Sequence, residues 1–402
     1  MTHVLIGEGP GSARAAADRI GLTVGDEILD GGSAARVFHA RSGDGSALVL
    51  KIVIARPGLV DGHDIGAFLG KLTQLGLIQA GDPRLAARYL PVLHVVRGPG
   101  WAACTTPFYP STDLAAPLRA TPDPTAFFAL HTRLIEDLIG PGYGQTIVRA
   151  QPRFVEDALV ARIPRRRGLL AGHLPSDLLD ADPLTINGIR CVSPFHLLNS
   201  LVTDPPPWWS RIAPPRLMFP AHGDANTRNV LVGEDGLRLI DPRGSTAFWD
   251  PIYDLAKTLF SLTVWDPSQR LGGYGRRTGD GWEAGFRHPP FAGYHAAVDG
   301  FLDHLSASPD FGELMTDDPH WGSRLLFTHA LHVLAEAPCR LSDPKEKRDV
   351  AGSLLAPGDL ALCHYLLGTL LLNDVVARLN TDTLDSAAHL AMARQNPFAA
   401  IA

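Results

Sequence analysis

Lysine is scarce in this chain, which has 402 residues. The only lysines are Lys51, Lys71, Lys257, Lys345 and Lys347. Arginine supplies most of the positive charge. A lysine inside an apolar segment therefore stands out as a candidate functional residue.

Cysteine is also rare, and the four that occur lie far apart in the sequence. They are Cys104, Cys191, Cys339 and Cys363. Without paired spacing they match neither a zinc knuckle nor the framework of a disulfide-rich domain. We therefore interpret them as buried thiols of a protein in a reducing compartment.

The chain lacks an excess of positive charge, since 36 Lys and Arg stand against 42 Asp and Glu and the formal net charge is −6. A basic surface draws proteins to nucleic acids and anionic lipids, so we expect neither as a partner. The amino terminus does not resemble a secretory signal, and the most apolar stretch, residues 365–372, is too short to span a bilayer. These features predict a soluble, cytoplasmic protein.

The first hundred residues predict a small antiparallel sheet. Tight turns join the first three strands, and parallel neighbours would need a long crossover instead. Strands are expected at 27–29, 35–41, 47–55, 89–96 and 101–105, with helices at 12–20 and 65–79. Only the second of these helices is long.

The pattern changes to helical periodicity after Thr106–Pro110. Helices are expected at 126–139, 154–163, 195–202, 251–262, 291–305, 321–337 and 360–379. The fold class is therefore α+β, with a small antiparallel β-sheet lobe and one long helix, then a larger, mostly α-helical lobe. We place the lobes at 1–106 and 112–402, with a hinge at 107–111.

The segment 221–256, AHGDANTRNVLVGEDGLRLIDPRGSTAFWDPIYDLA, is the most informative part of the sequence. A strand at 230–232 and a returning strand at 237–240 form a hairpin around Glu234-Asp235-Gly236. Asp224 and Asn229 precede this hairpin and Asp241 follows it, so their oxygen atoms converge. Such ligands suit a hard cation such as magnesium.

HGDANTRN, followed by LIDPRG and DPIYDLA, resembles the aminoglycoside phosphotransferase family, which is similar to protein kinases. The resemblance implies a bilobal protein-kinase-like fold, with a catalytic loop at 222–229 and a metal-binding turn at 241–244. It makes Asp224 the catalytic aspartate and Asn229 and Asp241 the ligands of Mg²⁺. Asp254 would brace the catalytic loop through backbone hydrogen bonds, and His222 would have a structural role.

Two features upstream fit a nucleotide site. Gly31, Gly32 and Ser33 lie where the family places its nucleotide-covering loop, and small residues let backbone N–H groups approach phosphates. Lys51 lies in a strand that is apolar on both faces, where an unpaired ammonium is costly. The alternatives are an ordinary hairpin turn for the loop, and a lysine whose head reaches solvent for Lys51.

Three features depart from the family pattern or extend it. No glutamate occurs between Lys51 and Glu136, so Asp64, at the head of the long helix, is the best replacement as partner of Lys51; a helix cap is its alternative role. Pro242-Arg243 replaces the usual residues after Asp241 and leaves the role of Arg243 open. Thr106 and Phe108 lie in the segment 106–109 at the hinge, whose backbone would meet the base of the nucleotide.

The sequence thus predicts a small-molecule kinase that uses magnesium and ATP or GTP. The acceptor would be a hydroxylated small molecule such as an aminoglycoside, a sugar or an amino alcohol. The alternatives are a nucleotide-binding pseudokinase that acts as a scaffold, a protein kinase and a metal-dependent phosphohydrolase. The acceptor and the oligomeric state are left open.

Overall fold

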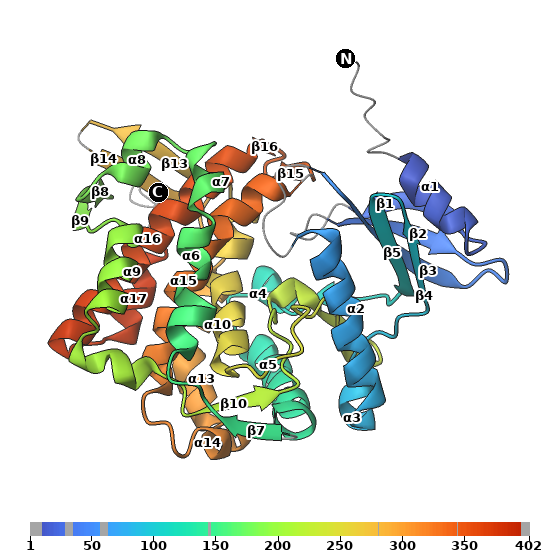
Figure 1. Cartoon of the computed structure of the whole chain (residues 1–402), viewed down its shortest axis with the longest axis horizontal. Coiled ribbons are helices and arrows are strands. Elements are labelled where there is room, and N and C mark those ends of the chain that lie inside the picture. Colours follow the sequence, from blue (N-terminus) through green and yellow to red (C-terminus); the bar gives the residue numbers. More distant parts are fainter. Residues whose placement is uncertain are drawn as a thin grey trace.

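The computed structural model describes residues 10–28, 35–56, 63–143, 146–279, 281–343 and 345–394. The chain forms two lobes, with the amino-terminal lobe at the right of Figure 1 and the larger helical lobe at the left. The elements of the first lobe are α1 (Pro10–Asp18), β1 (Thr23–Ile28), β2 (Arg36–Arg41), β3 (Ala47–Ile54), α2 (Ile65–Ala80), α3 (Pro83–Ala86), β4 (His94–Gly98) and β5 (Trp101–Pro107).

The amino-terminal lobe is an antiparallel sheet with strand order β1-β2-β3-β5-β4. Alternation along β3 sends Leu48, Leu50 and Ile52 to the face covered by α1. The opposite face, with Val53, packs against Phe68 of α2. Lys51 has the same parity as Val53, so it lies on the face that α2 covers. This sheet and its long helix confirm the predicted lobe.

The second lobe is mainly helical, and α15 and α16 pack against each other at its centre (Figure 1). Its helices are α4 (Ala116–Ala120), α5 (Thr125–Leu138), α6 (Arg162–Arg165), α7 (Arg167–Ala171), α8 (Ser176–Asp180), α9 (Pro194–Thr203), α10 (Ile252–Phe260), α11 (Asp266–Arg270), α12 (Ala292–Asp299), α13 (Phe301–Ala307), α14 (Pro309–Leu314), α15 (Trp321–Ser342), α16 (Pro357–Thr381) and α17 (Ser386–Met392). At Gly368 the two central helices are so close that a Cβ would lie 2.6 Å from the backbone of Leu334.

Short strands complete the helical lobe. They are β6 (Thr112–Asp113), β7 (Thr146–Arg149), β8 (Leu184–Ile186), β9 (Ile189–Cys191), β10 (Arg216–Phe219), β11 (Val230–Gly233), β12 (Gly236–Leu239), β13 (Gly273–Thr278), β14 (Gly281–Phe286), β15 (Lys347–Arg348) and β16 (Leu354–Leu355). The hairpin predicted after the polar segment is present as β11 and β12. The sheet of order β13-β14-β8-β9 was not predicted.

Helix α16 is longer than the apolar stretch at its centre suggests. With 25 residues it is long and apolar enough to cross a membrane, by length and composition alone. However, 78% of its most apolar window is buried inside the protein, as is typical of a core helix. The helix lies between α15 and the sheet that contains β13 and β14.

Candidate active site

A cavity of about 620 Å³ lies between the lobes. It brings together residues from distant parts of the chain, because β3 and β5 form one wall and residues 224–241 with α10 and α15 form another. Six of the predicted site residues line it: Lys51, Thr106, Phe108, Asp224, Asn229 and Asp241. Asp64 is not among the lining residues, and Gly31, Gly32 and Ser33 lie outside the described residues.

The loop that begins at His222 is held by Asp254, a buried residue in the first turn of α10. Its carboxylate accepts hydrogen bonds from the backbone N–H groups of Gly223, at 3.0 Å, and Ala225, at 3.2 Å. Tyr143 donates a further hydrogen bond to the same carboxylate. These contacts confirm the bracing role predicted for Asp254.

His222 connects the loop to the end of the hairpin. Its Nδ1 accepts the N–H of Asp224 at 3.1 Å, which leaves the proton on Nε2 to donate to the Ile240 carbonyl at 3.0 Å. The ring stacks on Tyr89, with 5.8 Å between centroids. Because both nitrogens are used within the fold, the predicted structural role of His222 is confirmed.

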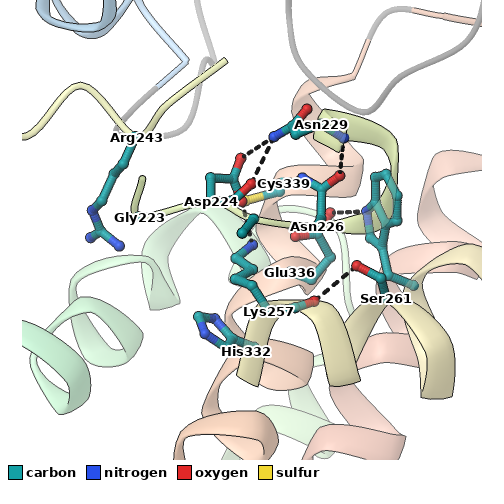
Figure 2. A network of polar contacts seen from close by, with 12 residues as sticks. Gly223, Asp224, Asn226, Asn229, Arg243, Lys257, Ser261, His332, Glu336 and Cys339 are labelled. Carbon is teal, nitrogen blue, oxygen red and sulfur yellow. Dashed lines mark hydrogen bonds and ion pairs between the residues drawn. The ribbon is translucent and has the colours of Figure 1, made fainter. Parts of the chain in front are cut away.

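Asp224 faces the cavity beside two groups that fix it (Figure 2). Asn229 Nδ2 donates to the Asp224 backbone carbonyl at 2.8 Å and to Oδ2 at 3.2 Å. Lys257 Nζ lies 3.1 Å from Oδ1. Burial alone would raise the pKa of Asp224, but Lys257 and Lys71 bring it below its ordinary value. The carboxylate is therefore ionised at neutral pH.

Two lysines of the amino-terminal lobe, Lys51 and Lys71, act on Asp241. It forms an ion pair with Lys51, and its backbone has a φ of +55°, which is uncommon for a residue with a side chain. Burial opposes ionisation of Asp241, but Lys51 and Lys71 together hold its pKa well below the ordinary value. The converging group predicted from the sequence is therefore assembled around a charged carboxylate.

Helix α2 reaches the site through contacts that the sequence did not indicate. Gln74 donates to the carbonyl of Ala221 at 2.6 Å and accepts the N–H of Gly244 at 2.6 Å. Gly244 has a φ of +90°, and a Cβ there would lie 2.9 Å from the backbone nitrogen of Lys71. This close packing fixes the helix so that Lys71 lines the cavity.

The expected pairing of Lys51 with Asp64 is absent among the ion pairs of the described residues. Asp64 is exposed and caps α2, where it accepts the N–H of Ala67 at 2.8 Å. Lys51 pairs with Asp241 instead. The helix thus supplies a lysine, not an acid, to this part of the cavity, and the cap that was the alternative role of Asp64 is what the structure contains.

Arg243 lies on the side of Gly223 away from Asp224 (Figure 2). Its guanidinium stacks on Trp249, at 4.5 Å, and Tyr253, at 4.9 Å, and donates to the Tyr253 hydroxyl. A Cβ on Gly223, which has a φ of +77°, would lie 2.7 Å from Arg243 Cβ. Arg243 therefore packs beneath the loop and is absent from the cavity lining.

The wall near the hinge is mostly apolar, with Val37, Val49 and Ile240 beside Thr106 and Phe108. The N–H of Phe108 donates to the Ala47 carbonyl at 3.0 Å, so this amide already has a partner in the sheet. The rings of Phe108 and His39 pack edge to face, with 5.2 Å between their centroids. Phe108 therefore lines the cavity while its amide is used within the sheet.

The sequence motifs did not indicate three lysines of this site, Lys71, Lys257 and Lys345. The scarcity of lysine could have identified them, because four of the five lysines line the cavity, with Lys347 as the exception. Lys257 also follows Asp254 by three residues, so both begin on one face of α10.

No protein-family model and no curated protein matches this sequence. Among solved structures, the chain is similar to a Thermobifida fusca protein assigned as a fructosamine-3-kinase, with 14% identity over 94% of this chain and 98% of that one and a TM-score of 0.41. An aminoglycoside-3'-phosphotransferase of type VIII has 20% identity over 79% of this chain and 98% of its own length, with a TM-score of 0.39. An amicoumacin kinase bound to AMP-PNP, Ca²⁺ and Ami has 13% identity over 95% of this chain and 97% of its own length, with a TM-score of 0.40. All three TM-scores are below 0.5, so the protein-kinase-like fold is assigned from the strands and helices of this chain and not from these neighbours.

Proposed function

We propose that this protein transfers the γ-phosphoryl group of a nucleoside triphosphate to a hydroxyl group of a small molecule. The observation that carries the proposal is the meeting of Asp224, Asn229, Asp241 and Lys51 in one cavity between the lobes. Phosphoryl transfer needs these parts: a carboxylate for the attacking hydroxyl, oxygen ligands for a metal, and cations for phosphates. ATP and GTP are both candidate donors.

Lys51 and Lys71 would bind the phosphates of the nucleotide. Lys51 now pairs with Asp241, and burial lowers the pKa of Lys71 although Asp241 acts in the opposite direction. An anion between the two ammonium groups would relieve both their mutual repulsion and their desolvation. The apolar wall beside Thr106 and Phe108 suits a base.

The oxygen atoms of Asn229 and Asp241 suit a divalent metal such as Mg²⁺. Asp241 stays ionised because of its lysine neighbours, and Asn229 offers an amide oxygen while its nitrogen donates to Asp224. A bound Mg²⁺ would neutralise negative charge on the phosphates. Asn229 and Asp241 are the residues that we propose to hold it.

Asp224 would orient the attacking hydroxyl and accept its proton as the oxygen–phosphorus bond forms. Its carboxylate is ionised and fixed by Lys257 and Asn229, so it can accept a hydrogen bond from the acceptor. Lys257 limits the build-up of negative charge as the phosphoryl group approaches. Asp254 contributes by positioning the loop.

A pseudokinase is the second candidate, since the acidic partner of Lys51 on α2 is missing. However, α2 contributes Lys71, whose charge suits phosphate, and Asp224, Asn229, Asp241 and Lys51 all line the cavity. A protein kinase is disfavoured because only residues 242–251 connect Asp241 to α10, which leaves little room for an activation loop. A phosphohydrolase is disfavoured because the described residues hold no cluster of three or more His, Cys, Asp or Glu fit for a metal.

We also propose a cytoplasmic location. Cys104, Cys191 and Cys363 are buried free thiols, and Cys339, which is half-buried, is free as well. Free thiols are typical of proteins in reducing compartments.

Nucleotide binding gives the first test. MgATP or MgGTP should raise the melting temperature of the native protein, and removal of magnesium should abolish most of the increase. Asp241→Asn should lose the magnesium-dependent part while keeping its fold. If neither nucleotide stabilises the native protein, the proposal is wrong.

A further inference from the structure

One face of α2 packs directly on the backbone of the catalytic segment, residues 221–244. Gly70 and Gln74 are four residues apart, so they share this face, and Lys71 lies between them. A Cβ on Gly70 would lie only 3.0 Å from the carbonyl oxygen of Gly244. Because neither glycine has a side chain, the helix and the end of the catalytic segment come into direct contact.

Gln74 joins two parts of this segment that are far apart in the sequence. Its Nε2 donates to the Ala221 carbonyl and its Oε1 accepts the N–H of Gly244, both at 2.6 Å. The two parts also contact each other, since the N–H of Arg243 donates to the His222 carbonyl at 2.8 Å. Gln74 is 1% exposed. It therefore holds, from inside the protein, the backbone at both ends of the catalytic segment.

The chemistry of residue 74 matches this contact. An amide offers a donor and an acceptor from one group, and the two backbone partners need one of each. A glutamate has nearly the same shape but has no donor when ionised, so it would set a carboxylate oxygen against the Ala221 carbonyl. The residue is therefore suited to a backbone bridge and not to an ion pair.

The bridge also sets the position of Lys71, which precedes Gln74 by three residues, or about 4.5 Å along the helix. Lys71 lines the cavity, whereas Gln74 does not. A Cβ on Gly244 would lie 2.9 Å from the backbone nitrogen of Lys71, so the packing leaves no room for the helix to move closer. Among the described residues no ion pair joins α2 to Lys51. Hydrogen bonds to backbone thus fix the helix where an ion pair was expected.

We infer that Gln74 is a positioning residue of the proposed nucleotide site, because its two hydrogen bonds hold α2 against the catalytic segment and thereby place Lys71 beside the phosphates. It takes the place of the acidic partner of Lys51 that the family pattern led us to expect on this helix. The inference rests on the proposed function. Since Gln74 is absent from the cavity lining, a change at this residue alters nucleotide binding through the residues that it holds.

The test measures nucleotide affinity by titration calorimetry, with MgATP or MgGTP, whichever binds the native protein more tightly. Gln74→Met keeps an unbranched side chain of the same length and forms neither hydrogen bond. We expect it to bind the nucleotide about fivefold more weakly. In the Lys71→Met background the same substitution should cause no further loss, because the residue through which Gln74 acts has already lost its charge.

Asn373→Leu is the matched control for the loss of a buried amide bridge. Asn373 also holds one backbone residue with both ends of its amide, since it donates to the Val192 carbonyl at 2.9 Å and accepts the Val192 N–H at 2.8 Å. It lies outside the cavity lining. Asn373→Leu should lower the melting temperature, as Gln74→Met does, but leave the nucleotide affinity at the native value.

Gly70→Ala tests the same contact from the helix if Gln74→Met does not fold. Alanine favours the helix, but its Cβ would press on the Gly244 carbonyl, so α2 must shift away and the nucleotide should bind more weakly. Gly76→Ala is the control on the same helix, because a Cβ there meets no atom within 4 Å. It should bind the nucleotide as the native protein does.

Native affinity in Gln74→Met, or in Gly70→Ala where that variant replaces it, overturns the inference. A loss of affinity from Gln74→Met that is equally large in the Lys71→Met background also overturns it, as does an equal loss in Asn373→Leu. If neither MgATP nor MgGTP binds the native protein, the proposed kinase function is contradicted instead.

Discussion

Lys71 is the residue in which the site departs most from the sequence expectation. It lies on α2, seven residues after Asp64, the residue expected as the acidic partner of Lys51, and together with Lys51 it lowers the pKa of Asp241. Two cations around one carboxylate leave a net positive charge, which suits the phosphates of a nucleotide.

Lys71→Met keeps an unbranched side chain, one atom shorter, and removes its charge. We predict that the affinity for MgATP falls by about tenfold, since a charge-assisted contact to phosphate is lost. The melting temperature without nucleotide should stay the same or rise, because the variant no longer buries an ammonium group. Titration calorimetry and thermal denaturation measure the two quantities. Unchanged nucleotide affinity would show that Lys71 does not touch phosphate.

Residue motifs in the sequence were sufficient to find Asp224, Asn229, Asp241 and Lys51, because a hairpin and an apolar strand dictate where they point. The same reasoning failed for Asp64, since a helix cap and an ion-pair partner have the same sequence signature. Motifs alone could not identify Lys71, although the scarcity of lysine could have done so. The place of Lys71 in the cavity depends on how α2 packs against Ala221 and Gly244.

At the scale of elements, α15 is clamped to the start of α10 by a buried charge triad. Arg324 Nε lies 2.7 Å from Asp250, and Arg324 also pairs with Asp318. Only 2% of the Arg324 and Asp250 side chains is exposed. Asp250 further accepts the N–H of Ile252, so the triad fixes the helix that carries Asp254 and Lys257.

Arg324→Leu should lower the free energy of unfolding by about 3–5 kcal/mol, because it leaves two buried carboxylates without their cation. Chemical denaturation measures this change. The control is Arg348→Ala, which removes an exposed pair with Glu346 and should cost at most about 1 kcal/mol. Equal losses in the two variants would contradict the clamp.

Most helices lie where apolar periodicity placed them, and so do β2, β3 and β5, whereas the strands expected at 27–29 and 89–96 are found at Thr23–Ile28 and His94–Gly98. Other departures have local causes. The helix expected at 291–305 is divided at Gly300 into α12 and α13, and the one expected at 154–163 begins as a wider helical turn, Val155–Val160. Strand β13 escaped prediction because Gly and Arg are poor strand formers. It forms where Gly275 meets α16, since a Cβ there would lie 2.6 Å from Leu362.

For the whole molecule, buried histidines predict a loss of stability in acid. Burial lowers the pKa of His131 and His63 to about 3, and that of His329, His332 and His364 well below its ordinary value. These groups stay neutral in the folded chain, whereas the unfolded chain binds their protons below about pH 6.5. Stability is therefore complete above that pH and falls below it.

Each such histidine should cost about 1.4 kcal/mol per pH unit between about pH 6 and pH 3. Urea denaturation at pH 7.5, 6.5 and 5.5 measures the slope, and His131→Leu should reduce it. A native protein that is equally stable at all three pH values would contradict the burial of neutral histidines.

The proposal that the two lobes enclose a phosphoryl-transfer site is tested most directly by following the γ-phosphate itself. Protein with Mg²⁺ and γ-labelled ATP or GTP is offered a panel of neutral, anionic and cationic hydroxylated acceptors, beside Asp224→Asn. We predict label in an acceptor, with Asp224→Asn slower by about 10²–10⁴-fold but still stabilised by the nucleotide. Label that appears only as inorganic phosphate, or that reaches an acceptor equally fast in Asp224→Asn, would contradict it.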